Sequence, residues 1–250
     1  MKKNRKKKPN INKLYRFEVL YKPGTYMSDE KLETVITKLR DTALTCFDKL
    51  PDYQVFLGTR EEMADKVIAI AWKDDVIAGF CSTVLFDIKG VGKVQHLGLT
   101  CVRPEERSNG LTHVLTHKAV KVHWLKTNPL GKLWISNCAA VLSSLVNGSL
   151  FFENIHPSPL TNGKVQKNHL KIAEAIDKYY REKIYIDKDA TFDKEKFVFK
   201  GSVKNTVFQK DKNDTQFYHR KTDLNDYYKG IMNFENGDEV LQIGYASSLV

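Results

Sequence analysis

The sequence has no hydrophobic run of about 18 residues, the length that a helix needs to cross a membrane. No apolar segment follows the basic N-terminus, where residues 10–13 are mainly polar, so no signal peptide is predicted. Cysteine is scarce: the 250 residues include four, far apart and without a Cys-x-x-Cys pair. This pattern excludes a disulfide framework and favours reduced thiols in apolar surroundings. We therefore expect a soluble cytoplasmic protein.

Common nucleotide-binding and zinc-binding motifs are missing as well. The chain contains no P-loop, which would need Gly-Lys-Ser/Thr, and no Gly-x-Gly-x-x-Gly dinucleotide motif. His113 and His117 have the spacing of two metal ligands on one face of a helix. However, the glutamate of the zinc motif is absent and no third ligand is evident. We expect two solvent-facing histidines and no metal.

Positive charge is concentrated at the N-terminus. The net charge is +10, and six of the positive charges lie within the first eight residues. We expect residues 1–13 to form a disordered basic tail, a candidate to bind nucleic acid, an acidic surface or a nuclear import receptor. The alternative is a solvated arm without a partner. The remaining charge of +4 and the 42% hydrophobic content are ordinary for a globular domain.

Hydrophobic periodicity predicts an α/β domain over residues 14–160. Strands are expected at residues 14–21, 67–72, 76–86, 94–102 and 133–136, and helices at 28–50, 111–128 and 139–152. This order contains a β-α-β crossover, so the sheet should be mixed. In residues 161–250 we expect a helix up to Ile184, strands at 197–199 and 207–208, a loop at 210–214 and a closing strand at 240–250. This region should complete the sheet and the substrate side.

One loop has the features of a phosphate-binding site. A buried strand ends at Val102, Pro104 follows, and a helical period begins at Leu111. The first N–H groups of such a helix are unpaired and attract anions. Gly110 permits close approach of a ligand to the backbone, and Arg107 adds a positive charge. The alternative is an ordinary strand-to-helix turn with a polar cap.

The same loop resembles the acetyl-CoA-binding motif of the GNAT superfamily of N-acetyltransferases, Arg/Gln-x-x-Gly-x-Gly/Ala. This sequence has Arg107-x-x-Gly110-x-Thr112, and the threonine departs from the pattern. Asn137 and Gly148 also fall at the family's spacing, and a hairpin precedes the motif strand. The resemblance covers roughly residues 67–152. It implies a GNAT-like mixed, mostly antiparallel twisted sheet flanked by helices, with acetyl-CoA as co-substrate.

The resemblance also implies roles for individual residues. The coenzyme should contact the motif strand, the loop and the asparagine after the next strand: Leu99, Thr100, Cys101, Val102, Arg107, Ser108, Asn109, Gly110, Leu111, Thr112 and Asn137. His96 takes the position of the family's catalytic base, and an imidazole suits that task near neutral pH. Ser144 stands where many members have a proton-donating tyrosine. Alternatives are a structural role for His96 and a donor among the C-terminal tyrosines.

Three functions follow from these observations. The first is an acyl-CoA-dependent N-acyltransferase that moves an acetyl group directly to an amine, of a small molecule or a protein, in a ternary complex. The second is a regulatory protein that binds nucleic acid through its basic arm. The third is a protein that binds CoA without turnover, which the Thr112 and Ser144 departures keep open.

Overall fold

The computed structural model describes residues 11–161 and 164–247. The six basic residues within the first eight positions, and with them most of the predicted tail, lie outside these ranges. The last part of that predicted tail is helical instead, because α1 (Ile11–Leu14) begins there and leads directly into β1.

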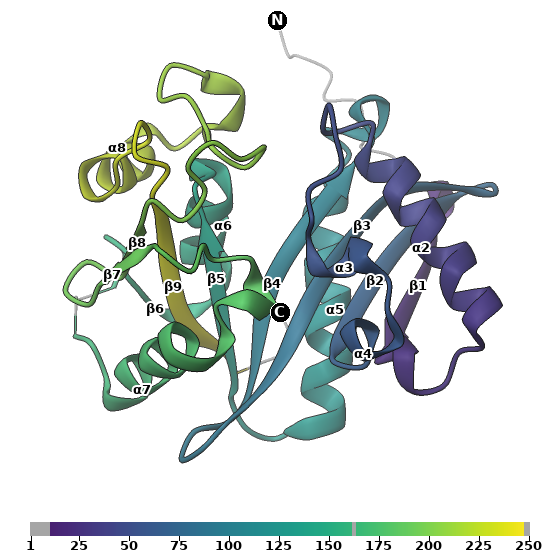
Figure 1. Ribbon diagram of the computed structural model, residues 1–250, viewed down its shortest axis with the longest axis horizontal. Coiled ribbons are helices and arrows are strands. Elements are labelled where there is room, and N and C mark those ends of the chain that lie inside the picture. Colours follow the sequence, from purple (N-terminus) through teal and green to yellow (C-terminus); the bar gives the residue numbers. More distant parts are fainter. Residues whose placement is uncertain (1–10, 162–163, 248–250) are drawn as a thin grey trace, which may run out of the picture.

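Nine strands of the described chain form one sheet (Figure 1). Its order is β1-β2-β3-β4-β5-β9-β8-β7, and β6 pairs with β9 at its side. The strands are β1 (Arg16–Tyr21), β2 (Lys66–Lys73), β3 (Val76–Ile88), β4 (Gly92–Val102), β5 (Leu133–Ala139), β6 (Glu153–His156), β7 (Thr191–Asp193), β8 (Val198–Lys200) and β9 (Glu239–Ala246). Among these pairs only β4–β5 is parallel, the two strands being joined by a helix. The prediction of a mixed, mostly antiparallel sheet with one crossover is confirmed.

Helices cover both faces of the sheet, because strand side chains alternate between them. On one face, called here the α2 face, lie α2 (Asp29–Ala43), α3 (Gln54–Leu57), α4 (Arg60–Met63) and α7 (Lys167–Ala175). On the other, the α5 face, lie α5 (Leu111–Thr127), α6 (Leu142–Phe151) and α8 (Thr222–Ile231). Figure 1 shows α2 in front of the sheet and α5 behind it. Within the described ranges, no helix has the length and apolarity needed to cross a bilayer.

A β-bulge divides β4 into two halves. Thr83 of β3 is opposite Leu97 and Cys81 is opposite Thr100, so two residues of β4 face Ser82 alone. One extra residue reverses the side on which every later side chain points. Before the bulge His96 lies on the α2 face; after it the odd-numbered Cys101 does so.

Beyond the bulge β4 also loses its second neighbour. The parallel pairing with β5 runs from Val94↔Trp134 to Leu97↔Asn137 and then stops, although β4 continues to Val102. Figure 1 shows the two strands diverging from there. No other strand of the described chain pairs with this edge of β4. Its backbone groups therefore face away from the sheet without a ladder partner.

The C-terminal region builds the far half of the same sheet. β9 pairs with β5 along its whole length, from Leu133↔Ala246 to Ala139↔Val240, and β8 pairs with β9 on its other side. The predicted closing strand is therefore an inner strand of the sheet. The strand predicted at residues 207–208 is wrong: these residues lie in turns, and the Phe208 ring packs 5.7 Å from that of Tyr53.

Two α-helices end earlier in the structure than their hydrophobic periodicity predicts. The helix predicted to reach Leu50 stops at Ala43, because the following turn brings the Cys46 N–H to the Ala43 carbonyl and the Phe47 ring onto Phe208. The α-helix predicted to reach Ile184 ends at Ala175. From there the chain continues through a π-helical turn and a 3₁₀ turn, which ends at Ile184. The short α3 and α4, and the later α8, were not predicted.

A buried histidine links β1 to α5. His123 is 2% exposed, and its Nδ1 lies 3.1 Å from the Tyr21 hydroxyl. Its Nε2 has no hydrogen-bond partner among the described atoms. Burial, and then the nearby Lys22 and Lys93, lower the pKa of His123 to about 4. The ring is therefore neutral in the folded protein at pH 7.

We predict that His123→Gln makes the fold less sensitive to acid. The unfolded state binds a proton near pH 6.5, whereas the folded state does so only near pH 4. The contribution of neutral His123 is thus fully present above pH 6.5 and is lost as the pH falls, by about 3 kcal/mol at pH 4. Urea unfolding at pH 7 and pH 4.5 should show a smaller loss in the variant than in the wild type. An equal loss would contradict this assignment.

Candidate functional site

The loop after β4 presents an uncapped helix N-terminus. A 3₁₀ turn (Pro104–Glu106) is followed by Ser108 at φ 69° and Gly110 at φ 80°, both left-handed. Gly110 is the N-cap of α5 and offers no side chain, so the N–H groups of the first helical turn lack an acceptor. A Cβ placed on Gly110 would meet no atom within 4 Å, so the space beside this residue, directly before the first turn of α5, is open.

The N-terminus of α2, unlike that of α5, is capped by a side chain. There Ser28 caps the helix, its hydroxyl accepting from the Lys31 N–H, and two acidic residues occupy the first turn. The first turn of α5 has neither a cap nor an acid. The positive end of the α5 dipole is therefore left for an external anion.

A buried network holds this loop to β1 and β2. The Tyr15 hydroxyl donates to Glu106 Oε2 at 2.6 Å and accepts from Asn109 Nδ2 at 2.9 Å. Lys73 Nζ donates to Glu106 Oε1 at 2.6 Å. These hydrogen bonds, from Lys73 and then Tyr15, lower the pKa of Glu106, which is 7% exposed. The ionised carboxylate fixes the loop, and Lys73 neutralises the charge that would repel an anion.

Arg107 lies at the rim and connects the loop to the free edge of β4. Its Nε donates to the Val102 carbonyl at 3.3 Å, while its side chain remains largely exposed. The Cys46 thiol donates to the same carbonyl at 3.4 Å. The structure therefore places Arg107, Ser108, Asn109 and Gly110 beside the end of β4 and adds Cys46 to this group; the contact of these residues with a coenzyme stays a prediction.

The four strand residues of the predicted site lie on both faces of β4. Leu99 and Cys101 pack on the α2 face, and Val102 packs against α5. The Thr100 side chain is half-buried. All four residues belong to the part of β4 whose backbone edge is free. This edge, and not a common set of side chains, is therefore available to a ligand. Leu111 is buried beneath the first turn of α5, and Thr112 is exposed on it.

Asn137 is the last residue of β5 that pairs with β4, and its amide is held in place. Its Nδ2 donates to Gln242 Oε1 at 3.3 Å on the α5 face. Gln242 in turn donates to the Tyr228 hydroxyl at 2.6 Å. Burial raises the pKa of Tyr228 to about 12. Gly148 belongs to the same packing, since a Cβ there would lie 2.5 Å from Gln242 Oε1.

Ser144 lies on α6, on the stripe that also carries Phe151, because seven residues make nearly two helical turns. The Phe151 ring packs 4.3 Å from His113 of α5, so this stripe borders the start of α5. The proton-donor role of Ser144 stays a prediction. Within the described ranges, no group of three His, Cys, Asp or Glu side chains that could hold a metal ion includes His113 or His117. His113 is exposed, as expected, whereas His117 is half-buried.

His96 is placed one residue before the strands part. It is 1% exposed, its Nδ1 lies 2.9 Å from the Ser136 hydroxyl, and its ring packs on Phe86. Burial lowers the pKa of His96 to about 3. An imidazole with this pKa is a weak base at neutral pH, and this argues against a role of His96 as the catalytic base. The role stays a prediction.

A carboxyl group that the sequence analysis missed lies close by. Glu239 begins β9 on the α2 face and is 9% exposed. Its Oε2 accepts from the Ser202 hydroxyl at 2.6 Å and from the Cys138 thiol at 3.8 Å. Cys138 is the first residue of β5 beyond the pairing with β4. Burial raises the pKa of Glu239 to about 7. No local pattern marks this residue, because only the pairing of β9 with β5 brings it here.

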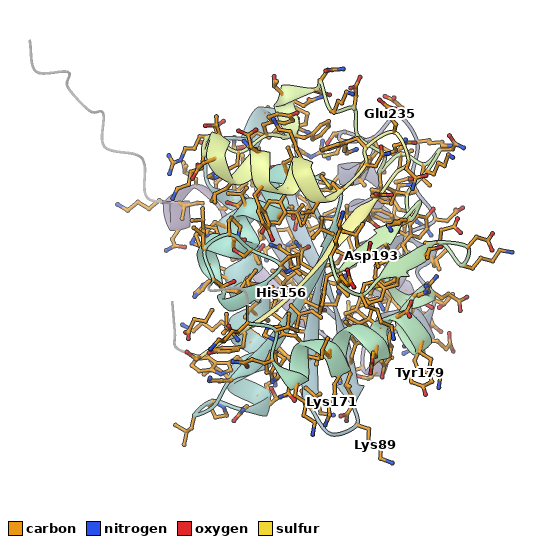
Figure 2. The ribbon with its side chains drawn as sticks, turned by 90° about the vertical axis from the view of Figure 1, so that its left-hand side faces the viewer. Lys89, His156, Lys171, Tyr179, Asp193 and Glu235 are labelled. Carbon is orange, nitrogen blue, oxygen red and sulfur yellow. The ribbon has the colours of Figure 1, made fainter. Side chains whose placement is uncertain are left out.

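His156 belongs to the sheet and not to a surface loop. It lies on β6, opposite Ile243, with its ring 4.6 Å from Phe197. Figure 2 shows it near the middle of the molecule, while Lys171 and Tyr179 project from the rim. His156 is thus a packing residue of the C-terminal half.

No family model matches this sequence, and no curated protein does. Solved structures share part of the fold. An acyl-CoA N-acyltransferase from Pseudomonas aeruginosa is 16% identical, with a TM-score of 0.42, over 60% of this chain and 93% of the other. A protein described as a predicted acetyltransferase from Clostridium acetobutylicum, solved with acetyl-CoA, is 14% identical, with a TM-score of 0.39, over 63% of this chain and 97% of the other. A protein described as a GNAT-family acetyltransferase from Desulfovibrio desulfuricans is 13% identical, with a TM-score of 0.40, over 56% and 85%.

We predict that Tyr15→Phe loosens the loop between β4 and α5. The change removes the hydrogen bond to the buried Glu106 carboxylate and should lower the free energy of unfolding by about 1–3 kcal/mol. Chemical denaturation measures it. Tyr26→Phe is the matched control, because Tyr26 is 60% exposed, and it should change stability by less than about 0.5 kcal/mol. Equal effects of the two variants would contradict the anchoring role.

Proposed function

We propose that this protein is an acyl-CoA-dependent N-acyltransferase of the GNAT type, which transfers an acetyl group from acetyl-CoA to an amine. The observation that carries the proposal is the free edge of β4 leading to the uncapped N-terminus of α5. This combination suits a ligand that is extended and amide-containing at one end and phosphorylated at the other. Acetyl-CoA has this form.

The chain's own groups fit each part of such a ligand. The first-turn N–H groups of α5 and the Arg107 guanidinium would bind the pyrophosphate. The backbone edge of β4 from Leu99 to Val102 would pair with the pantetheine amides, as one strand pairs with another. Arg107 would release the Val102 carbonyl for this purpose. The open space at Gly110 leaves room for the phosphate to approach the backbone.

The acetyl group would then lie where β4 and β5 part, and the amine would approach from the α2 face. Glu239 is the carboxyl group that supports proton removal there, because it is buried, hydrogen-bonded and adjacent to Cys138 at the point of divergence. Its proton affinity lies near neutrality, as general base catalysis requires. A water molecule can carry the proton between the amine and the carboxylate.

The free amine attacks the thioester carbonyl directly, within a ternary complex. A backbone N–H on the free edge of β4, near Thr100 or Val102, would polarise that carbonyl. A hydroxyl is a weak acid, so solvent supplies the proton for the leaving thiolate unless Ser144 relays it. The buried Cys101 thiol has no role in direct transfer.

We predict that Gly110→Trp abolishes acetyl-CoA binding. The indole would fill the space before the first turn of α5. With acetyl-CoA at about 100 times its Kd, the wild type should gain about 2.7 kcal/mol of stability, a rise in Tm of about 5 °C or more. The variant should show no rise.

Gly92→Trp is the control for this variant. Gly92 is the first residue of β4, directly after the turn from β3, and is also at positive φ with open space around its Cβ position. The backbone strain of the two variants is therefore similar, and Gly92→Trp should keep the acetyl-CoA shift. If the wild type shows no shift, or both variants keep it, the coenzyme assignment is wrong.

We predict that Glu239→Gln lowers kcat/KM by about 100-fold, the usual size of a general base effect. Wild-type kcat/KM should fall as the pH drops below about 7, because protonated Glu239 cannot accept a proton. The variant should lose this dependence. The measurement is CoA release with the best acceptor from an amine panel. Glu235→Gln, an exposed carboxylate beside Lys212, should leave both rate and profile unchanged.

A further inference from the structure

Two thiols and a guanidinium meet at the end of β4. Cys46 lies in the turn after α2, where its N–H bonds to the Ala43 carbonyl at 2.8 Å. Its sulfur lies 3.4 Å from the Val102 carbonyl oxygen, and its side chain packs against the core cluster that contains the neighbouring Cys101. The Arg107 Nε donates to the same carbonyl at 3.3 Å, and the guanidinium lies near enough to help lower the pKa of the Cys46 thiol.

The two thiols differ in the way that a reactive pair requires. Cys46 is half-buried, whereas Cys101 is 1% exposed. The hydrogen bond from Cys101 lowers the pKa of Cys46 to about 5; Thr45 and Arg107 assist and burial opposes. The pKa of Cys101 is raised well above its ordinary value by the same contact and by burial. The half-buried Cys46 is thus the more readily ionised thiol of the two, and the buried Cys101 keeps its proton.

The other two cysteines provide an internal contrast. Cys81 and Cys138 have their pKa values raised by burial, and neither lies beside a cation. Cys81 contacts the Thr116 hydroxyl, and Cys138 faces the Glu239 carboxyl. Reactivity toward oxidants follows thiolate character and exposure, so these two should be inert.

We propose that Cys46 and Cys101 form a peroxide-oxidisable dithiol, in which Cys46 is the reacting sulfur and Cys101 resolves the product to an intramolecular disulfide.

The Cys46 thiolate attacks one oxygen of hydrogen peroxide. An S–O bond forms, the O–O bond breaks, and the hydroxide that leaves takes a proton to become water. Cys101 then loses its proton and attacks the Cys46 sulfur; the S–S bond forms and the S–O bond breaks. The second hydroxide leaves as water. Two thiols are oxidised and one peroxide is reduced to two waters.

Oxidation changes the electrostatics of the loop. When reduced Cys46 ionises, it gives up the S–H that it donates to the Val102 carbonyl, and the thiolate offsets part of the positive charge of the nearby Arg107, whereas a disulfide is neutral. Arg107 then presents its whole charge to an anion. This consequence rests on the proposed function and predicts that acetyl-CoA binds the oxidised protein several-fold more tightly. The disulfide itself does not depend on that function.

The test begins with the reduced, full-length wild type. Iodoacetamide at pH 6 should alkylate Cys46 about tenfold faster, or more, than Cys81 and Cys138. A stoichiometric amount of hydrogen peroxide should leave two of the four thiols free, with Cys46 linked to Cys101 in the peptide map. Preferential loss of Cys81 or Cys138, or oxidation of Cys46 without the cross-link, would overturn the proposal.

Variants separate the two roles. Cys101→Ser should let Cys46 accumulate as a sulfenic acid that dimedone traps, whereas Cys46→Ser should give neither the adduct nor the cross-link. Cys138→Ser should behave as the wild type. Thermal shifts with acetyl-CoA are then compared for the oxidised and reduced protein. If neither form is stabilised, the proposed function fails while the dithiol result stands.

Discussion

The single extra residue in β4, opposite Ser82, is the constraint on which the site depends. It reverses the side to which later residues of β4 point and coincides with the end of pairing to β5 at Leu97 and Asn137. A strand that keeps one neighbour and loses the other exposes a row of backbone donors and acceptors. Elsewhere such an edge is a liability for aggregation. Here it leads directly to the uncapped start of α5, and the two together form the surface on which the proposed coenzyme would lie.

Two buried glutamates show how the surroundings of a carboxyl group set its role. Glu106 has a lysine and a tyrosine as partners, stays ionised and holds the loop. Glu239 has only the neutral Ser202 and Cys138, and burial raises its pKa toward neutrality. The first is suited to structure and the second to moving a proton. They lie on either side of the divergence between β4 and β5, so binding and proton transfer are assigned to different parts of one sheet.

The Val102 carbonyl connects these parts. It is the acceptor for both Arg107 and Cys46, so the loop, the free strand edge and the turn after α2 share one hydrogen-bonding group. A ligand pairing with this edge competes with both donors. The Arg107 guanidinium, which would bind a phosphate, therefore lies near Cys46. A change in the charge of the Cys46 sulfur alters the electrostatic potential at the proposed coenzyme site.

Local patterns in the chain predicted the first five strands, the crossover helix and the loop from Arg107 to Gly110. These features depend on alternation, helical period and turn residues that lie next to one another in sequence. The bulge in β4, the insertion of β9 beside β5, the Glu239 environment and the contact between Cys46 and Cys101 could not be predicted in this way. Each joins segments that are far apart in the chain, and the free energy that brings them together comes from packing across the sheet. Phe208 is the clearest case: its apolar neighbours suggested a strand, but its ring is held against Tyr53 by the tertiary core.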